Sequence, residues 1–131
     1  MSMKDEIVKI GLLAQKAYKV PPDMRISDVR ELLKPEKPFF PIVIIEDKKP
    51  LGILVSMHLY NKLSTRYGFS LFQNRPVSEI MDSDPLIVDF DEPLEKVAAF
   101  AMCREAGKLY DHLIVTKNGE LSGTVSVRSI M

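Results

Sequence analysis

The chain contains two copies of one pattern. Residues 20–33 align with residues 88–101 at a constant offset of 68 positions. Further along, residues 41–52 align with residues 112–123 at an offset of 71, so the second copy has three more residues in the intervening loop. Each copy is too short to bury a sufficient core alone, and repeats of this kind fold together. We therefore expect one pseudo-symmetric module with a shared core, and a cleft between its halves as the default ligand site.

Length and composition exclude several classes of protein. The 131 residues, 46% of them hydrophobic, suit one domain. The 18 basic and 18 acidic residues cancel, and without a broad positive field we expect no nucleic-acid partner. The longest apolar runs are strand-sized, below the roughly 20 residues of a membrane helix, so we expect no membrane insertion. A single cysteine and the lack of a secretory signal pattern favour the cytoplasm.

Hydrophobic spacing predicts the order of the elements. Apolar residues at helical spacing predict a short amphipathic helix within residues 1–19. The first copy and the inter-repeat segment then occupy residues 20–76, and the second copy occupies residues 77–131. Each copy has the pattern strand, helix, strand, strand, helix, which is an α+β arrangement.

The second copy gives the sharpest local predictions. Its apolar residues from Leu94 to Met102 recur at the spacing of a core-facing helix, and Asp91 is the predicted N-cap. The pair Asn118-Gly119 predicts a tight hairpin turn between the last two strands.

The order of elements, with Asp82–Leu94, a hydrophobic strand and Asn118–Gly123, resembles the cystathionine-β-synthase (CBS) domain, here as a tandem pair over residues 18–131. Residues 66–81 are similar to the inter-repeat segment of CBS pairs attached to GGDEF and EAL domains in bacterial signalling proteins. The resemblance implies two pseudo-symmetric β-α-β-β-α repeats in one compact module. Because the chain stops inside the expected last helix, we expect a fragment of a larger protein with an attached signalling domain.

The resemblance also implies a function. CBS pairs commonly form homodimers and bind adenine nucleotides or related ligands to regulate an attached enzyme or transporter, without catalysis of their own. The implied ligands are AMP, ADP, ATP and S-adenosylmethionine, and no other cofactor is expected. In the family's nucleotide motif, a hydroxyl residue three positions after the hairpin glycine faces phosphate, and an aspartate six positions after it holds the ribose.

Those positions differ between the copies. Counted from Gly123 they hold Ser126 and Ser129, and the equivalent residues after Gly52 are Val55 and His58. Both copies lack the aspartate and only the second keeps the hydroxyl, so the second is the better candidate. Each cleft has its own set of expected ligand-binding residues. The set in the second copy is Ser126, Arg128, Ser129, His112 and Ile87, and the set in the first copy is His58, Val55, Pro41 and Val20.

A rival hypothesis is a ligand-free dimerisation scaffold that sets the spacing of signalling domains, and the missing aspartates favour it. The aromatic residues of the inter-repeat region would then pack the seam between the copies or a dimer partner, and Phe72→Asp should dissociate the dimer. They are Tyr60, Tyr67, Phe69 and Phe72.

Catalysis and metal binding have little support. His58, His112 and Cys103 do not fall at zinc spacing, so we expect no metal. A triad of Cys103 with Asp111 and His112 has no supporting motif, and we expect Cys103 to be an inert core residue. The chain is therefore not expected to be an enzyme.

Overall fold

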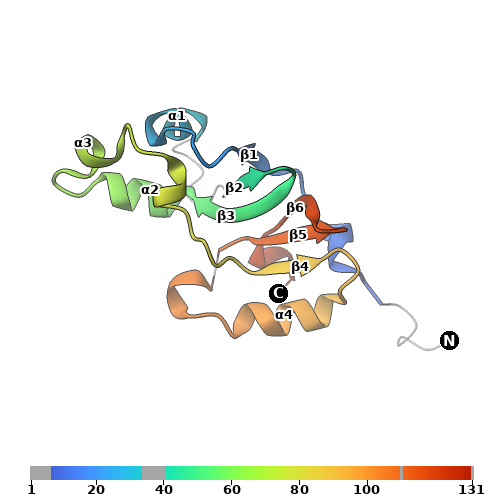
Figure 1. Cartoon of the computed structure of the whole chain (residues 1–131). Helices are drawn as coiled ribbons and strands as arrows, with labels where there is room; N and C mark the ends of the chain where they lie inside the picture. Colours follow the sequence, from blue (N-terminus) through green and yellow to red (C-terminus); the bar gives the residue numbers. More distant parts are fainter. Residues whose placement is uncertain (1–6, 34–40, 110, 131) are drawn as a thin grey trace. The chain divides into compact units, whose positions relative to one another are not determined.

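The computed structural model describes residues 7–33, 41–109 and 111–130 (Figure 1). These residues belong to two compact units, each of which is described by itself. The first unit is Ala17–Pro85, and the second consists of Met1–Lys16 together with Leu86–Met131.

The first unit is a three-stranded sheet with helices. Its strands are β1 (Tyr18–Val20), β2 (Pro41–Glu46) and β3 (Lys49–Val55). They lie in the order β1-β2-β3, with β1 and β2 parallel and β2 and β3 antiparallel. Its helices are α1 (Ile26–Leu32), α2 (Ser56–Leu63), α3 (Gly68–Phe72) and the 3₁₀ turn η3 (Val77–Glu79).

The second unit repeats this plan. Its strands are β4 (Ile87–Asp89), β5 (Leu113–Lys117) and β6 (Glu120–Val125), with the same order and the same parallel and antiparallel pairs. Its helices are α4 (Leu94–Met102) and the 3₁₀ turns η2 (Ile10–Leu13), η4 (Ala106–Lys108) and η5 (Val127–Ile130). The predicted α+β order of strand, helix, strand, strand and helix is confirmed in the first copy. The second copy has the same order, but the described residues of its last helix form the 3₁₀ turn η5.

The hairpin turns adopt the left-handed backbone that tight turns require. Asn118 and Gly119 have φ angles of 56° and 80°, so the Asn-Gly turn between β5 and β6 is confirmed. In the first unit, Asp47 and Lys48 hold the same two positions with φ angles of 53° and 69°. Both hairpins therefore have a two-residue turn, and glycine is present in only one of them.

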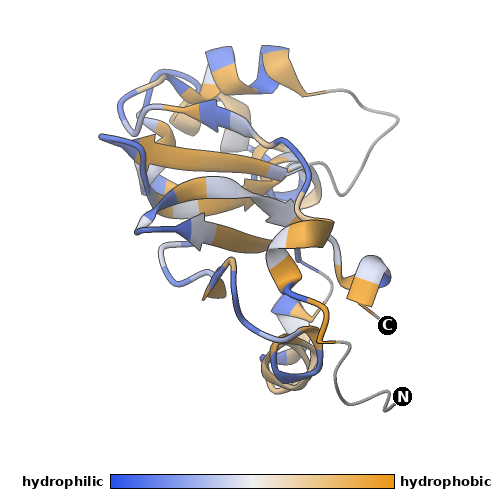
Figure 2. Cartoon of the chain, turned by 90° about the vertical axis from the view of Figure 1, so that its right-hand side faces the viewer, coloured by the Kyte–Doolittle hydropathy of each residue, from blue (hydrophilic) through white to orange (hydrophobic). Residues whose placement is uncertain are grey.

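Each unit has its own hydrophobic core cluster, where the sequence predicted one shared core. In Figure 2 the strands are mostly hydrophobic and the turns between them hydrophilic. The core of the first unit consists of Val20, Ile26, Val29, Leu33, Ile42, Ile44, Leu54, Leu59 and Val77. The core of the second unit consists of Ile10, Val88, Val97, Ala101, Leu113, Val115 and Val125.

Each unit includes a segment that lies outside its own copy in the sequence. Val77, at the start of the second sequence repeat, is fully buried in the core of the first unit. Ile10, which precedes the first repeat, is fully buried in the core of the second unit. The sequence repeats and the compact units therefore have different bounds, and residues 77–85 belong to the first unit although they open the second repeat.

Two local predictions were wrong. The described residues of the predicted N-terminal helix form only the short turn η2, because the N–H groups of Ile10 and Gly11 donate to the carbonyls of Glu92 and Phe90 instead of bonding within a helix. Residues 1–6 lie outside the described part. The N-cap of α4 is Pro93 and no side chain caps it, whereas the carboxylate of Asp91 pairs with Lys9 at 3.2 Å.

Candidate functional site

Three of the predicted ligand-binding residues lie at one end of the second unit's sheet. Ile87 is the first residue of β4, His112 directly precedes β5, and Ser126 directly follows β6. Leu113 pairs with Val125 across the antiparallel strands. His112, one residue before Leu113, and Ser126, one residue after Val125, therefore lie opposite each other at the same end of the two strands. The starts of β4 and β5 and the end of β6 therefore bring these residues to a common edge.

Ser126 and Ser129 form a hydroxyl pair at this edge. Their Oγ atoms lie 2.8 Å apart, and the backbone N–H of Ser129 donates to the carbonyl of Ser126 at 3.0 Å. Each hydroxyl has one proton and two lone pairs, so the pair keeps one proton for another acceptor. Arg128 lies between the two serines on η5 and is exposed. We call Ile87, His112, Ser126, Arg128 and Ser129 the serine edge.

His112 is the least satisfied polar residue of the serine edge. Its Nδ1 atom is buried and has no hydrogen-bond partner among the described residues. Burial lowers the pKa of His112 below its ordinary value of 6.5, and the negative charge of Asp111 opposes that shift. The lowered pKa favours the neutral imidazole, which has one ring nitrogen as donor and the other as acceptor.

The loop before β5 is held by Arg104, two residues after the end of α4. Its Nη2 donates to the backbone carbonyls of Leu109 at 3.2 Å and Asp111 at 2.9 Å, and its Nε donates to the carbonyl of Ala101 at 3.3 Å. Asp111 itself is buried. Arg104 was not among the predicted functional residues, and its position in the sequence gives no sign of these three bonds.

The predicted residues of the first copy do not form an equivalent polar edge. Pro41 and Val55 are paired across β2 and β3, and Val55 is only 1% exposed. His58 is exposed on α2. Val20 belongs to the core cluster, and the residue equivalent to Ile87 at the offset of 68 is the exposed Lys19. Because adjacent strand residues face opposite sides of a sheet, this difference of one residue places Val20 in the core.

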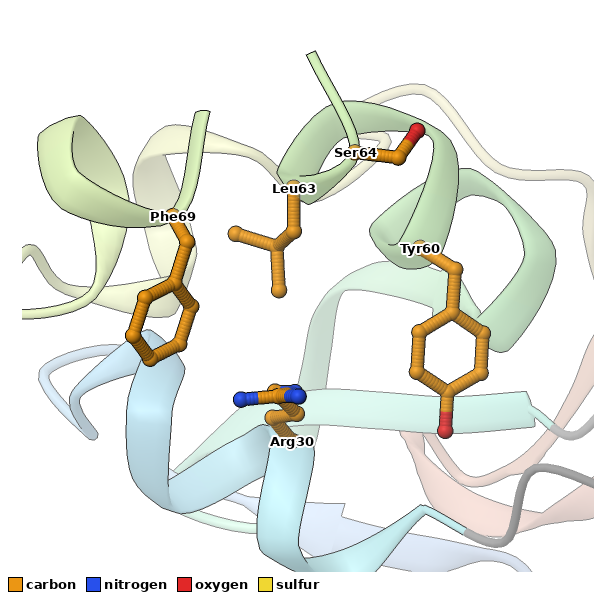
Figure 3. Close-up of a pocket in the computed structure, with 5 residues that line it drawn as sticks. All are labelled: Arg30, Tyr60, Leu63, Ser64 and Phe69. Carbon is orange, nitrogen blue, oxygen red and sulfur yellow. The ribbon is translucent and has the colours of Figure 1, made fainter. Parts of the chain in front are cut away.

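A pocket of about 480 Å³ lies elsewhere in the first unit and was not predicted from the sequence (Figure 3). Tyr60 and Phe69 were expected to pack a seam, and both line this pocket with Leu63, Ser64 and Arg30. In the sequence, the aromatic residues of the inter-repeat region were the only indication of this pocket. They did not indicate that Arg30 lines it with them.

Other chemistry finds no support in the described part of the chain. No group of three or more His, Cys, Asp or Glu residues there is arranged to hold a metal ion. Cys103 is exposed, and the expectation of a core position was wrong because α4 ends at Met102, which leaves Cys103 at the C-cap. None of the described helices is long and apolar enough to span a membrane.

Comparisons with known proteins identify the family of this fold. The family model described as CBS domain matches residues 77–131, which is the second copy. A search of curated protein sequences finds no significant match. Among solved structures, the chain is similar to a CBS domain-containing protein from Bacillus anthracis, with a TM-score of 0.77 and 15% identity, covering 97% of this chain and 94% of that one.

Two other structures show the same likeness. The CBS-pair protein CBSX2 from Arabidopsis thaliana has a TM-score of 0.74 and 21% identity, covering 95% of this chain and 92% of that one. The cytosolic domain of the Mg²⁺ channel MgtE in complex with ATP has a TM-score of 0.72 and 21% identity; the match covers 93% of this chain and 47% of that one, so this chain spans about half of its length. The chain therefore has the fold of a CBS-domain pair, and its second copy matches the CBS domain family.

Proposed function

We propose that the chain is a non-enzymatic regulatory module that binds a small anionic ligand, an adenine nucleotide by preference, at the serine edge. The observation that carries this proposal is the hydroxyl pair of Ser126 and Ser129, whose Oγ atoms lie 2.8 Å apart at the same sheet end as His112. The pair retains one proton that can be donated to a phosphate oxygen.

Each residue of the serine edge has a role in this proposal. Ser126 donates to a phosphate oxygen, and Arg128 adds a charge that suits phosphate. Ile87, at the start of β4, offers an exposed apolar surface for the base. Ser129 stands where the family's motif has aspartate, and losing that charged acceptor lowers the affinity by about ten- to a hundredfold. The similar MgtE domain was solved with ATP, which supports the ligand class.

The first copy remains the weaker site. With Val20 in the core and Val55 buried, Pro41 and the exposed His58 are what the first copy retains of its predicted set. We therefore assign one nucleotide per chain, in the second unit.

The proposed regulatory role rests on the coupling of ligand binding to a conformational equilibrium. A ligand that binds one arrangement of the module more tightly than another shifts the population by its differential affinity. In this proposal the shift is passed to an attached or partner signalling domain in the cytoplasm.

Thermal unfolding of the whole chain with AMP, ADP, ATP and S-adenosylmethionine tests this function. A ligand at about 100 times its dissociation constant stabilises the fold by about 2.7 kcal/mol, which raises the midpoint by several degrees. Ser126→Ala should abolish the shift, and the control Ser122→Ala, at an exposed position of β6, should retain it. The proposal fails if no member of the panel raises the midpoint at millimolar concentration.

A second candidate is the ligand-free homodimeric scaffold that spaces GGDEF- or EAL-type domains. It is favoured by exposed apolar side chains gathered on α1 and around α3, which are Leu32, Tyr67, Phe69 and Leu71. Phe72, by contrast, packs against the core of the first unit, so Phe72→Asp would unfold the unit as well as disturb an interface. Leu71→Asp, at a residue that is 60% exposed, is the cleaner variant. Sedimentation velocity should show a dimer that Leu71→Asp dissociates and that nucleotide does not affect.

A further inference from the structure

The pocket of the first unit is built by three helical elements. Arg30 comes from α1, Tyr60 and Leu63 come from α2, and Phe69 comes from α3, with Ser64 directly after α2. In Figure 3 the guanidinium of Arg30 lies among the side chains of Leu63, Phe69 and Tyr60. The pocket of about 480 Å³ has the size of a small-molecule site, and its walls are mostly carbon.

Arg30 makes a cation–π contact and keeps its donors. Its guanidinium carbon lies 4.8 Å from the centre of the Phe69 ring. Such a contact uses the positive charge of the guanidinium and leaves its N–H groups available to an acceptor. Within residues 7–33, 41–109 and 111–130, Arg30 has no hydrogen bond or ion pair, while Arg25 and Arg75 of the same unit pair with carboxylates at 3.3 and 3.2 Å.

Tyr60 provides a second donor without an acceptor. Its ring packs against the core of the first unit, and its hydroxyl makes no hydrogen bond to any described residue. Ser64 differs because its hydroxyl already donates to the carbonyl of Asn61 at 3.0 Å. Among the described residues, the pocket lining thus combines a cation and a phenol with apolar walls and includes no carboxylate.

We propose that this pocket binds a small organic monoanion with an apolar body, such as an aryl carboxylate. The carboxylate accepts hydrogen bonds from the guanidinium of Arg30, and the body packs on Leu63 and Phe69. Because Phe69 already orients the guanidinium, little side-chain freedom is lost on binding. A nucleotide suits the pocket less well, since Arg30 is the single cation among the described residues that line it. This site is separate from the serine edge, and its ligand belongs to a different chemical class.

The residues that line the pocket belong to the first copy and the inter-repeat segment. At the offset of 68, the residue of α4 equivalent to Arg30 is Ala98. Phe69 belongs to the segment between the copies. The two sites therefore divide between the units, with hydroxyls in the second and a cation beside an aromatic ring in the first.

Nuclear magnetic resonance of the full chain tests the proposal, with 3-phenylpropionate as the probe and 3-phenylpropanamide as its neutral analogue. Saturable shift changes are expected at the methyl groups of Leu63 and the ring of Phe69. Arg30→Gln should weaken binding by about tenfold or more, since a charge-assisted pair is lost, and Arg30→Lys should have a smaller effect. The amide should bind more weakly than the acid.

Arg66→Gln is the matched control, because Arg66 also makes a cation–π contact, at 5.3 Å from the centre of the Tyr67 ring, and does not line the pocket. It should leave the affinity unchanged. Two results overturn the proposal. They are the lack of any saturable change up to about 10 mM and an affinity that Arg30→Gln does not alter.

Discussion

A Cβ atom on Gly52 would lie 2.6 Å from the carbonyl oxygen of Asp82. The N–H of Ile53 donates to that same carbonyl at 3.0 Å, which brings the segment after η3 against β3. The second unit has the same relationship, since a Cβ on Gly123 would lie 2.5 Å from the carbonyl oxygen of Gln15. These two glycines are needed because another segment's backbone approaches each of them too closely for a side chain.

Gly52→Ala should therefore destabilise the chain by about 1–3 kcal/mol, because the clash is with backbone that is held by hydrogen bonds. Urea unfolding measures the effect. Gly107→Ala is the control, because a Cβ there meets no atom within 4 Å, and it should change the stability by less than about 0.5 kcal/mol. Equal midpoints for wild type and Gly52→Ala would show that the segment after η3 moves freely.

The segment that precedes the first copy should stabilise the second unit. Ile10 is fully buried among the core residues of that unit, so Ile10→Ala should cost about 2–5 kcal/mol of unfolding free energy. Ile7, which is 65% exposed, provides the control, and Ile7→Ala should change the stability by less than about 0.5 kcal/mol. Similar effects of the two substitutions in chemical denaturation would contradict the assignment of Ile10 to the core.

The repeat in the sequence was sufficient to predict the order and type of the strands and main helices. Hydrophobic period and turn chemistry are local properties, and they identified α4 and the Asn118-Gly119 turn directly. The burial of Val77 in the first unit and of Ile10 in the second unit was not predictable in this way. The partners of a buried side chain are set by distant parts of the chain. The hydrogen bonds from Ile10 and Gly11 to the loop before α4 replaced the expected N-terminal helix for the same reason.

The candidate sites were predictable only in part. Counting from Gly123 placed Ser126 and Ser129 together, and the structure gives their hydroxyls a direct contact. Counting at the offset of 68 pairs Val20 with Val88, which is also a core residue, so the choice of Val20 as the counterpart of Ile87 was off by one position. Arg30 was missed because its proposed role in the pocket depends on its contact with Phe69. That residue is 39 positions away in the sequence and meets Arg30 only in the folded unit.

Stability should fall on mild acidification because of His112. Burial lowers the pKa of His112 in the folded chain below the ordinary value of 6.5, so the unfolded chain binds more protons between the two pKa values. The free energy of unfolding should therefore decrease as the pH falls through 6.5 and below it, until the folded form is also protonated. His112→Asn should remove this contribution, whereas the same change at the exposed His58 should leave it in place. Urea unfolding between about pH 7.5 and pH 5.5 measures the difference, and identical slopes for wild type and His112→Asn would contradict it.

Arg104 should stabilise the loop before β5, whereas Arg128 should contribute to ligand binding at the serine edge. Arg104 donates to three backbone carbonyls around the loop before β5, so Arg104→Met should leave buried acceptors unsatisfied and cost about 1–3 kcal/mol of stability. Arg128 is exposed on η5, and Arg128→Met should leave stability unchanged within about 0.5 kcal/mol while weakening nucleotide binding. Unfolding and nucleotide titration of both variants measure the two effects. If Arg128→Met lowered stability and left nucleotide binding intact, Arg128 would be a structural residue and the serine edge would lose its proposed cation.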